Sequence, residues 1–280
     1  ADNEADAVAG TQLAQTLNIQ ILPPKFRYSK AEYMCDKNTN TIYKGISSIK
    51  YLNAQVADEL YDLRDNQYDS FVDLLIDITT KTSINSRQLD ILIKLDYFSE
   101  FGKSRKLLKC VEYFNLFNNK KQIKKDKVKE LGIDEDIIKK YSNETEKQYN
   151  NLDSVEIIKE FCNTIENKSI SLQDRIKAEL EFLGYISFKE PRAKENYYVV
   201  IEYKTYKDKT KPYITLYQLK TGNIIKTNVK KGKTFVENPF KLYSVLKVLD
   251  FKEEYKKKLI DGKWTNTDEK KLVLNQWQVM

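Results

Sequence analysis

The stretch Ile46-Ser47-Ser48-Ile49-Lys50-Tyr51-Leu52-Asn53 is where the apolar residues of this chain take up a helical spacing. Two isoleucines three residues apart precede a break at residues 51–53, and apolar residues then return at intervals of three to four: Val56, Leu60 and Leu63. Such spacing gathers apolar side chains on one face of a helix. The sequence therefore predicts helical segments on both sides of a tight connection at residues 51–53.

The residues around this stretch predict a mainly helical N-terminal part. Upstream, the sequence indicates a helical pattern at residues 4–17, an extended segment at 19–22 that ends at Pro23 and Pro24, and a small hairpin around 41–45 after a turn at 38–40. Downstream, it predicts helices at 70–78, at 86–95 and, after Gly102, through Phe117, with Ser70 and either Asn85 or Ser86 as caps.

The next part of the chain, residues 118–194, is rich in lysine and asparagine. Short amphipathic pieces at 128–131 and 137–141 predict small helices with exposed loops, and a firmer helix is expected at 171–182, ending before Gly184. The charged run is more typical of a solvated face than of a binding arm, which is the alternative. We expect a variable helical connector.

From residue 195 to 280 the pattern changes to that of β-strands. Strands are predicted at 197–203, 213–219, 224–229, 241–249 and 271–279, with a hairpin turn at Thr221-Gly222-Asn223. Short strands with an aromatic-rich face and basic loops are typical of a small barrel such as the OB-fold. The predicted fold class is α+β with three domains, 1–117, 118–194 and 195–280.

Composition excludes several classes of enzyme. The chain has 280 residues and no histidine, so the commonest general base and metal ligand are both missing. Its three cysteines, Cys35, Cys110 and Cys162, form no CxxC pair and are expected to be buried apolar side chains in a reducing cytoplasm. We predict no catalytic residue, no metal site and no cofactor in this chain.

Neither a membrane span nor a secretory signal is predicted. No apolar run approaches the roughly 20 residues that a spanning helix needs. The acidic start, residues 1–10, lacks the basic and apolar regions of a signal peptide. Because the chain does not begin with methionine, we expect it to be a fragment or a processed chain rather than a natural start.

The net charge of +7 is unevenly distributed. Residues 195–280 have a clear excess of lysine over acidic residues, whereas residues 1–109 are about neutral, with 14 basic and 15 acidic side chains. A basic, tyrosine-rich segment is a reasonable electrostatic surface for a nucleic-acid backbone. The alternative is a general abundance of lysine, asparagine and isoleucine such as an AT-rich genome produces.

Several strings together resemble one family. Ile21-Leu22-Pro23-Pro24 resembles the "LPPDIN" element that follows the palm of bacterial-type (or phage) DNA polymerase III alpha subunits. Residues 43–50 are similar to the family's "FGLGAIKGVG", 68–74 to "PFKSFEDF", 84–94 to "LNKRVLEALIK" and 97–102 to "GAFDSLG". Residues 181–187 resemble the "KEVLGFYLS" that precedes the family's OB domain. The strings are collinear with the family, while residues 118–178 show almost no resemblance.

The resemblance implies a helix-hairpin-helix unit that contacts DNA through Lys50, Tyr51, Leu52 and Asn53. In the family, two hairpin glycines let backbone N–H groups approach a phosphate, because no Cβ intervenes. Here Tyr51 and Asn53 occupy those positions, and Tyr51 is expected to crowd the phosphate. Polymerase chemistry requires the palm and its Mg2+, which the resemblance places upstream of this chain.

The resemblance also implies a single-strand-binding barrel. Stacking tyrosines and a basic groove would hold unpaired bases. The candidate residues are Tyr198, Tyr203, Lys204, Tyr206, Lys207, Lys209, Lys211, Tyr213 and Tyr217. Since alternate strand residues face the core, about half of these tyrosines are expected to be structural, and the two tryptophans, Trp264 and Trp277, are expected to pack inside the barrel.

A contact with a sliding clamp is a further implication. The family's "QxxLF" type of motif lies between the helical unit and the barrel, where this chain has Tyr113, Leu116 and Phe117. Tyr113 replaces the glutamine of the motif, and an aromatic core face of a helix is the alternative interpretation.

These observations favour a DNA-binding, non-catalytic portion of a replicative polymerase that helps to hold template and primer DNA. Its partners would be DNA, both single-stranded and duplex, and the rest of an alpha subunit. The alternative is a freestanding DNA-binding or replication-scaffold module diverged from the polymerase tail.

Overall fold

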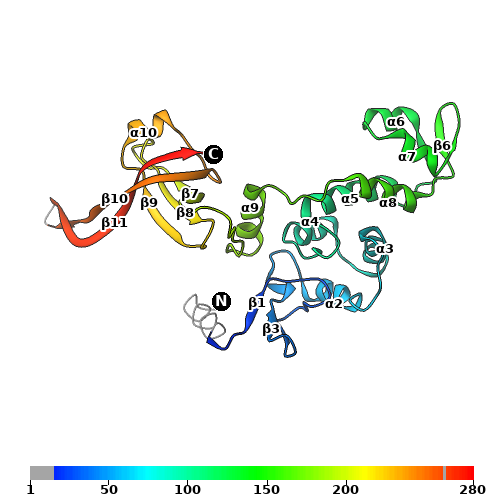
Figure 1. Ribbon diagram of the computed structural model, residues 1–280, viewed down its shortest axis with the longest axis horizontal. Coiled ribbons are helices and arrows are strands. Elements are labelled where there is room, and N and C mark those ends of the chain that lie inside the picture. Colours follow the sequence, from blue (N-terminus) through cyan, green and yellow to red (C-terminus); the bar gives the residue numbers. More distant parts are fainter. Residues whose placement is uncertain (1–15, 261–262) are drawn as a thin grey trace. The chain divides into compact units, whose positions relative to one another are not determined.

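The computed structural model describes residues 16–260 and 263–280 (Figure 1). Packing divides the chain into two compact units, which are described separately. The N-terminal unit runs to Ser171 and includes Glu181–Leu183, and the C-terminal unit comprises Leu172–Leu180 and Gly184–Met280. Of the helical pattern predicted at residues 4–17, residues 4–15 lie outside the described part of the chain. Within the described residues, no helix is long and apolar enough to cross a membrane.

The N-terminal unit begins with a small sheet. β1 (Gln20–Leu22) pairs in parallel with β3 (Thr41–Tyr43), and β2 (Met34–Asp36) pairs with β3 in an antiparallel arrangement. The hairpin predicted around residues 41–45 is therefore β2–β3, and its turn includes Asn40 at φ 52. The proline pair follows β1 directly, as predicted, because proline cannot donate a ladder hydrogen bond.

The helices of this unit follow the predicted hydrophobic pattern. They are η1 (Ile46–Ser48), α2 (Ala54–Asp62), α3 (Phe71–Lys81), α4 (Ser86–Lys94) and α5 (Ser104–Phe117). A further helix, α8 (Ser154–Thr164), was not predicted. Ser70 caps α3, and Asn85 rather than Ser86 caps α4 in a capping box with Gln88. These caps confirm the predicted helix starts.

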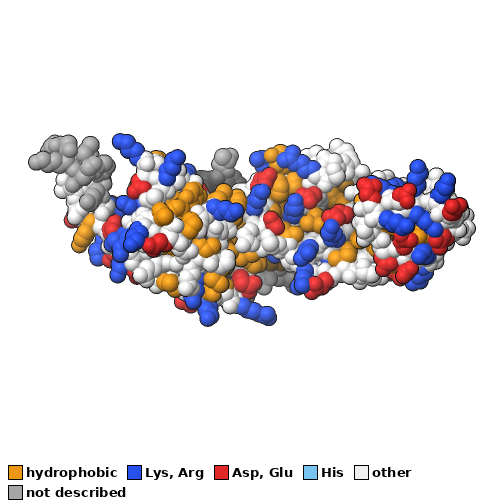
Figure 2. Space-filling view, turned by 90° about the horizontal axis from the view of Figure 1, so that it is seen from above, with side chains coloured by type: hydrophobic (Ala, Val, Ile, Leu, Met, Phe, Trp, Pro, Cys, Tyr) orange, Lys and Arg blue, Asp and Glu red, His pale blue; other side chains and the backbone are white. Residues whose placement is uncertain are grey.

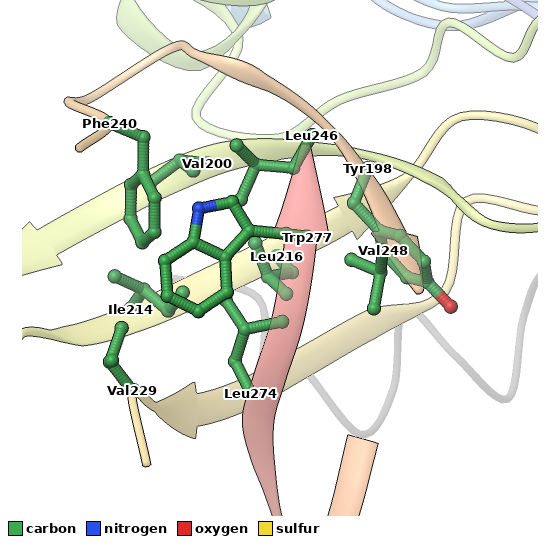
Figure 3. Close-up of a cluster of buried hydrophobic side chains, with 10 residues drawn as sticks. All are labelled: Tyr198, Val200, Ile214, Leu216, Val229, Phe240, Leu246, Val248, Leu274 and Trp277. Atoms are coloured by element: carbon green, nitrogen blue, oxygen red, sulfur yellow. The ribbon is translucent and has the colours of Figure 1, made fainter. Parts of the chain in front are cut away.

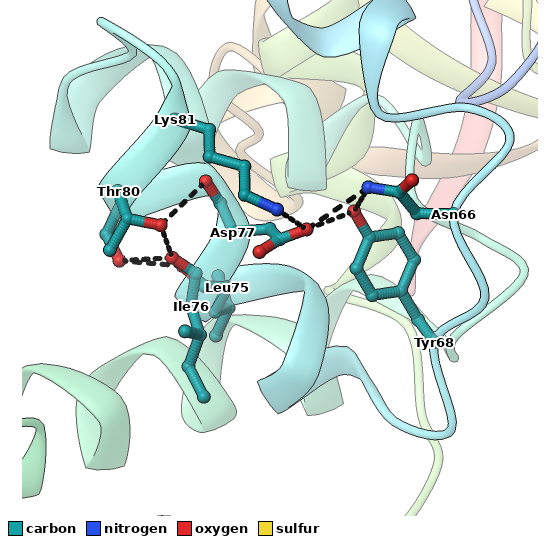
Figure 4. Close-up of polar contacts among 8 residues, drawn as sticks. Asn66, Tyr68, Leu75, Ile76, Asp77, Thr80 and Lys81 are labelled. Carbon is teal, nitrogen blue, oxygen red and sulfur yellow. Dashed lines mark hydrogen bonds and ion pairs between the residues drawn. The ribbon is translucent and has the colours of Figure 1, made fainter.

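A polar network fastens the loop before α3 to that helix (Figure 4). One carboxylate oxygen of Asp77 accepts hydrogen bonds from the Tyr68 hydroxyl at 2.9 Å, from Lys81 Nζ at 2.8 Å and from Asn66 Nδ2 at 3.3 Å. The hydrogen bond and charge of Lys81 hold the pKa of Asp77 below its usual value. The loop that leads from α2 to α3 is thereby held in one position.

Gly45 allows the chain to enter η1 past the backbone of residues 30–32. Ile46 N–H donates to Lys30 O at 2.9 Å, and Ser47 N–H donates to Ala31 O at 3.1 Å. A Cβ at position 45 would lie 2.3 Å from Ala31 O, far inside van der Waals contact. The close approach of the two backbone segments therefore requires glycine here.

We expect Gly45→Ala to lower the free energy of unfolding by about 3 kcal/mol, because backbone has to move to admit the methyl group. Gly132→Ala is the control: its Cβ would meet nothing within 4 Å, and only its φ of 61° opposes a side chain. That change should cost about 1 kcal/mol. Urea unfolding measures both, and equal losses would contradict the close approach at Gly45.

Residues 118–153 form a small subdomain within the N-terminal unit. β4 (Gln122–Lys124), β6 (Gln148–Asn150) and β5 (Asn143–Glu144) form a sheet in that order, and α6 (Lys125–Glu130) and α7 (Glu135–Lys140) lie between β4 and β5 in the sequence. Ile138 and Val128 are fully buried. The small helices predicted for the connector are confirmed, but packing places this region in the same unit as the preceding helices.

The lysine-rich run of this subdomain is a charge-paired surface. Lys125 pairs with Glu144, Lys140 with Glu160 at 2.7 Å, and Lys127 with Glu130 at 3.1 Å. Figure 2 shows basic and acidic side chains interspersed over this part of the chain, at the right of the view. The prediction of a solvated face agrees with this pairing.

Two of the three cysteines are buried, as predicted. Cys110 and Cys162 face each other between α5 and α8, and their mutual hydrogen bond and burial raise the pKa of the Cys162 thiol. Cys35 is exposed, so the prediction is wrong for this residue. It is the central residue of β2, an edge strand whose alternation turns that side chain outward.

The C-terminal unit is an antiparallel sheet with two helices. Its elements are α9 (Leu172–Phe182) up to Leu180, β7 (Tyr197–Lys204), β8 (Tyr213–Gln218), β9 (Ile224–Asn228), α10 (Gly232–Glu237), β10 (Val245–Ile260) and β11 (Lys263–Val279). The strand order is β11-β10-β7-β8-β9. α9 ends two residues before Gly184, which has a φ of 79°, as its predicted role requires.

The last two strands are longer than predicted. Strands were expected at 241–249 and 271–279, but β10 and β11 have 16 and 17 residues and form a long hairpin. Cross-strand pairs, Lys256 with Glu269 at 2.7 Å and Lys270 with Glu253 at 2.9 Å, accompany the extra length. The added residues are mostly charged. They lack the apolar alternation by which strands are predicted from a sequence. α10 was not predicted either.

Apolar residues from all five strands form the core of this unit around Trp277 (Figure 3). The indole is 3% exposed, and its N–H donates to Asn238 O at 3.0 Å. Phe240 packs edge-on against it at 5.4 Å. The predicted packing role of Trp277 is confirmed, whereas the side chain of Trp264 lies outside the described residues.

Candidate nucleic-acid interface

The first candidate surface is the connection between η1 and α2. Tyr51 has a φ of 72°, in the left-handed region that glycine adopts freely. Leu52 is 9% exposed and forms the apolar middle of the connection. Asn53 has φ −135° and ψ 169°, and its side chain accepts the N–H of Val56 at 2.9 Å as the cap of α2. The backbone shape of a hairpin between two helices is therefore present.

The two hairpin residues differ in backbone conformation. Asn53 is extended and caps a helix. Tyr51 takes the left-handed conformation instead, which costs a non-glycine residue roughly 1–2 kcal/mol. Two hydrogen bonds hold it there: Lys50 N–H donates to Phe182 O at 2.9 Å, and Gln88 Nε2 donates to Tyr51 O at 3.0 Å.

Two cations surround the Tyr51 ring. Arg87 Cζ lies 3.7 Å and Lys50 Nζ 5.1 Å from the ring centroid. A hydrogen bond with Lys50, followed by the charge of Lys50, lowers the pKa of the Tyr51 hydroxyl, and Arg87 acts in the same direction. The ring is 43% exposed. Lys50 was identified from the sequence, but Arg87 was missed because it lies far along the chain, in helix α4.

The second candidate surface is a hollow of about 250 Å³ on the outer face of β7, β8 and β9. Strand register brings Lys204, Tyr213 and Asn228 into one row and Glu202, Thr215 and Lys226 into the next. Lys271 of β11 reaches the same hollow, where its Nζ donates to Asn228 Oδ1 at 3.0 Å. Glu202 accepts a hydrogen bond from the Thr215 hydroxyl at 2.8 Å. The hollow thus has three lysines, one carboxylate and an exposed aromatic ring.

The loop between β7 and β8 adds to this surface. Tyr206 is 66% exposed, and its ring meets that of Tyr213 edge-on at 5.2 Å. The loop lysines identified from the sequence are all exposed: Lys207, Lys209 and Lys211. Exposed tyrosines beside lysines are the combination that holds unpaired bases and phosphates.

Three of the tyrosines identified from the sequence do not belong to this surface. Tyr198 and Tyr203 point into the core, the first buried and the second packed against Phe240 (Figure 3 labels Tyr198 and Phe240). Tyr217 is on the outer face, but it is buried against the α9 side of the sheet, and its hydroxyl donates to Phe188 O. Tyr198 and Tyr217 are buried and Tyr203 is partly buried against the core, so these three side chains are assigned to packing rather than to base stacking.

Lys226 and Lys271 were missed by the sequence analysis. Lys226 could have been found, because the turn at residues 221–223 fixes the register that pairs it with Thr215. Lys271 comes from the far end of the chain, and only the tertiary fold brings it to Asn228.

The residues considered for a clamp contact are part of a helix–helix packing. The Tyr113 ring stacks on Phe161 of α8 at 4.5 Å, and Phe117 is fully buried against the same ring at 5.6 Å. Leu116 is half-buried. Phe117 is therefore inaccessible to a partner while α5 and α8 are packed together, and the alternative of an aromatic core face describes these residues.

Comparison with known proteins bears on the first surface. Residues 18–108 match the family described as the helix-hairpin-helix motif, and the match includes both η1–α2 and the helices that follow. No curated protein matches the chain. The N-terminal unit thus carries a helix-hairpin-helix unit, and this motif indicates DNA binding.

Proposed function

We propose that this chain is the DNA-holding, non-catalytic portion of a replicative polymerase of the DNA polymerase III alpha type. The observation that carries the proposal is the helix-hairpin-helix unit, with its left-handed hairpin residue and its flanking Lys50 and Arg87. The collinear strings of residues 21–24, 43–50, 68–74, 84–94 and 97–102 support the polymerase assignment, since they lie within or beside this unit.

The proposal includes an OB-like barrel in the C-terminal unit. Support comes from the connection of β9 through α10 to β10, and from contacts where β9 ends beside β11. Val229 forms a parallel bridge with Leu274, Lys230 N–H donates to Leu274 O at 2.8 Å, and Thr227 Oγ1 donates to Leu272 O at 2.8 Å. In an OB-fold the second and third strands and the loop after the first bind oligonucleotides. Here these would be β8, β9 and the loop with Tyr206.

The hairpin would hold duplex DNA, and the hollow on β7–β9 would hold the single strand. Lys204, Lys226 and Lys271 would contact phosphates, while Tyr206 and Tyr213 would stack on bases. The partners would be template and primer DNA and the rest of an alpha subunit in the cytoplasm. The alternative is a freestanding replication-scaffold module, for which the replacement of the hairpin glycines by Tyr51 and Asn53 would mark weakened duplex binding.

Fluorescence anisotropy with labelled single-stranded and duplex oligonucleotides over a salt series tests DNA binding. We expect binding to both, with affinity that falls steeply as salt rises, because phosphate contacts release counterions. Failure to bind either form at low salt would overturn the proposal in favour of a protein-interaction role. The polymerase assignment has its own test: a palm with its acidic residues should be encoded upstream of Ala1.

A further inference from the structure

The chain contains a second hairpin between helices that resembles the first. Residues 82–85 connect α3 to α4, and Ile84-Asn85 corresponds to Leu52-Asn53. Both asparagines cap a helix by accepting the N–H three residues further on: Asn85 from Gln88 at 2.9 Å and Asn53 from Val56 at 2.9 Å. Both connections lie within residues 18–108, which match the helix-hairpin-helix motif.

The two hairpins form one surface. Gln88 in the first turn of α4 donates to the carbonyl of Tyr51 at 3.0 Å. Its neighbour Arg87 lies over the Tyr51 ring, where Lys50 is also close. The second hairpin is thus tied directly to the cationic cluster of the first. A phosphate backbone that reached Lys50 and Arg87 would pass beside residues 82–85.

In the second hairpin, the hydrogen-bond donors of Ser83 already bind a carboxylate. Glu59, on α2, accepts the N–H of Ser83 at 2.5 Å and the Ser83 hydroxyl at 2.7 Å through one oxygen. Its other oxygen accepts from Gln55 Nε2 at 2.9 Å. Ser83 lies two residues before the cap, the same offset as Tyr51 in the first hairpin. The backbone hydrogen bond from Ser83 is the main cause of the lowered pKa of Glu59.

We propose that Ser83 of the second hairpin is a phosphodiester-binding position, and that Glu59 is an internal anion that competes with DNA for it. The inference rests on the proposed DNA binding. A phosphate oxygen accepts from an N–H and a hydroxyl as a carboxylate does, and a partly exposed glutamate on a helix surface can rotate away. When duplex DNA binds, the Glu59 side chain leaves Ser83 and a phosphate takes its place. Glu59 therefore weakens duplex binding in the resting protein.

Duplex affinity of Glu59→Gln tests this competition. The glutamine keeps the shape and can still accept from Ser83, but it has no charge with which to repel a phosphate. We expect duplex binding about five- to tenfold tighter than wild type at low salt, with a smaller difference at high salt. Asp58→Asn is the matched control, since Asp58 is the adjacent exposed carboxylate of α2 and its removal changes the net charge equally. This control should tighten binding less than about twofold, because salt screens the effect of a single exposed charge.

The possible outcomes separate this inference from the proposed function. Equal tightening by Glu59→Gln and Asp58→Asn, or none by either, would overturn the competition while leaving DNA binding intact. If neither the wild type nor either variant binds DNA at low salt, the proposed function itself fails. NMR titration of the Glu59 carboxyl gives a second readout: its pKa should rise when duplex is added, and an unchanged pKa in the saturated complex would contradict displacement.

Discussion

Replacing Lys204, Lys226 and Lys271 together by glutamine is expected to weaken single-strand binding by about 100-fold at low salt. All three lysines line the hollow on β7, β8 and β9. They come from three different strands, and the fold brings their positive charges to the same place. Each phosphate contact to a single strand contributes about 0.7 to the slope of log affinity against log salt, so the slope should decrease by about 2. Anisotropy with a labelled single strand at several salt concentrations measures both quantities.

A second triple variant distinguishes the effect of losing the lysines of the hollow from the effect of a lower net charge. Lys220, Lys233 and Lys241 belong to the same unit, and none of them lines the hollow. Their replacement by glutamine changes the net charge by the same amount and should reduce affinity by only about threefold. If the two triple variants lose affinity to the same extent, the hollow is not the binding surface.

Tyr51→Gly is expected to strengthen duplex binding by about tenfold. The backbone at this position already has the left-handed conformation, with φ 72°, so glycine fits without strain and its missing side chain leaves room for a phosphate. The variant also loses the ring between Lys50 and Arg87, which frees both cations for DNA. Stability should change little, because relief of the left-handed conformation offsets the greater freedom of glycine in the unfolded chain.

Two further substitutions at Tyr51 distinguish the effect of the bulky ring from the effect of a Cβ in the left-handed conformation. Tyr51→Phe keeps the ring and should leave duplex affinity unchanged within about twofold, since it removes only the hydroxyl. Tyr51→Ala removes the ring but retains a Cβ in the left-handed region, so its gain should fall between those of Phe and Gly. Unchanged duplex affinity in Tyr51→Gly would show that a phosphate does not approach this hairpin.

The parts of the fold that local signals specify were predictable from the sequence. Ser70 and Asn85 cap helices where predicted, and the turn at 221–223 joins the two strands on either side of it. Local rules apply there because the side chain that decides the structure lies within a few residues of the backbone that it contacts. The long β10–β11 hairpin was missed because its stability depends on pairing across the hairpin and its pattern of charges has no apolar period.

The candidate surfaces were only partly predictable for a related reason. Lys50 and Tyr51 are adjacent in sequence and were identified, but Arg87 reaches them from another helix. Strand alternation explains why some of the candidate tyrosines are structural, as expected. Tyr198 and Tyr213 are on neighbouring strands, yet one points into the core and the other to solvent, and no composition signal distinguishes them. The sequence indicated a basic surface with exposed aromatic side chains, but the strand register determines which residues belong to it.

Photo-crosslinking most directly tests the claim that this protein holds DNA at the hairpin and on the β7–β9 face. Single-stranded and duplex oligonucleotides with 5-iododeoxyuridine would be irradiated with the whole chain, and the modified peptides identified by mass spectrometry. We predict that the single strand modifies peptides containing Tyr206 or Tyr213, and that the duplex modifies the peptide containing Tyr51. Adducts confined to the charge-paired surface of residues 118–153, from either oligonucleotide, would contradict this account.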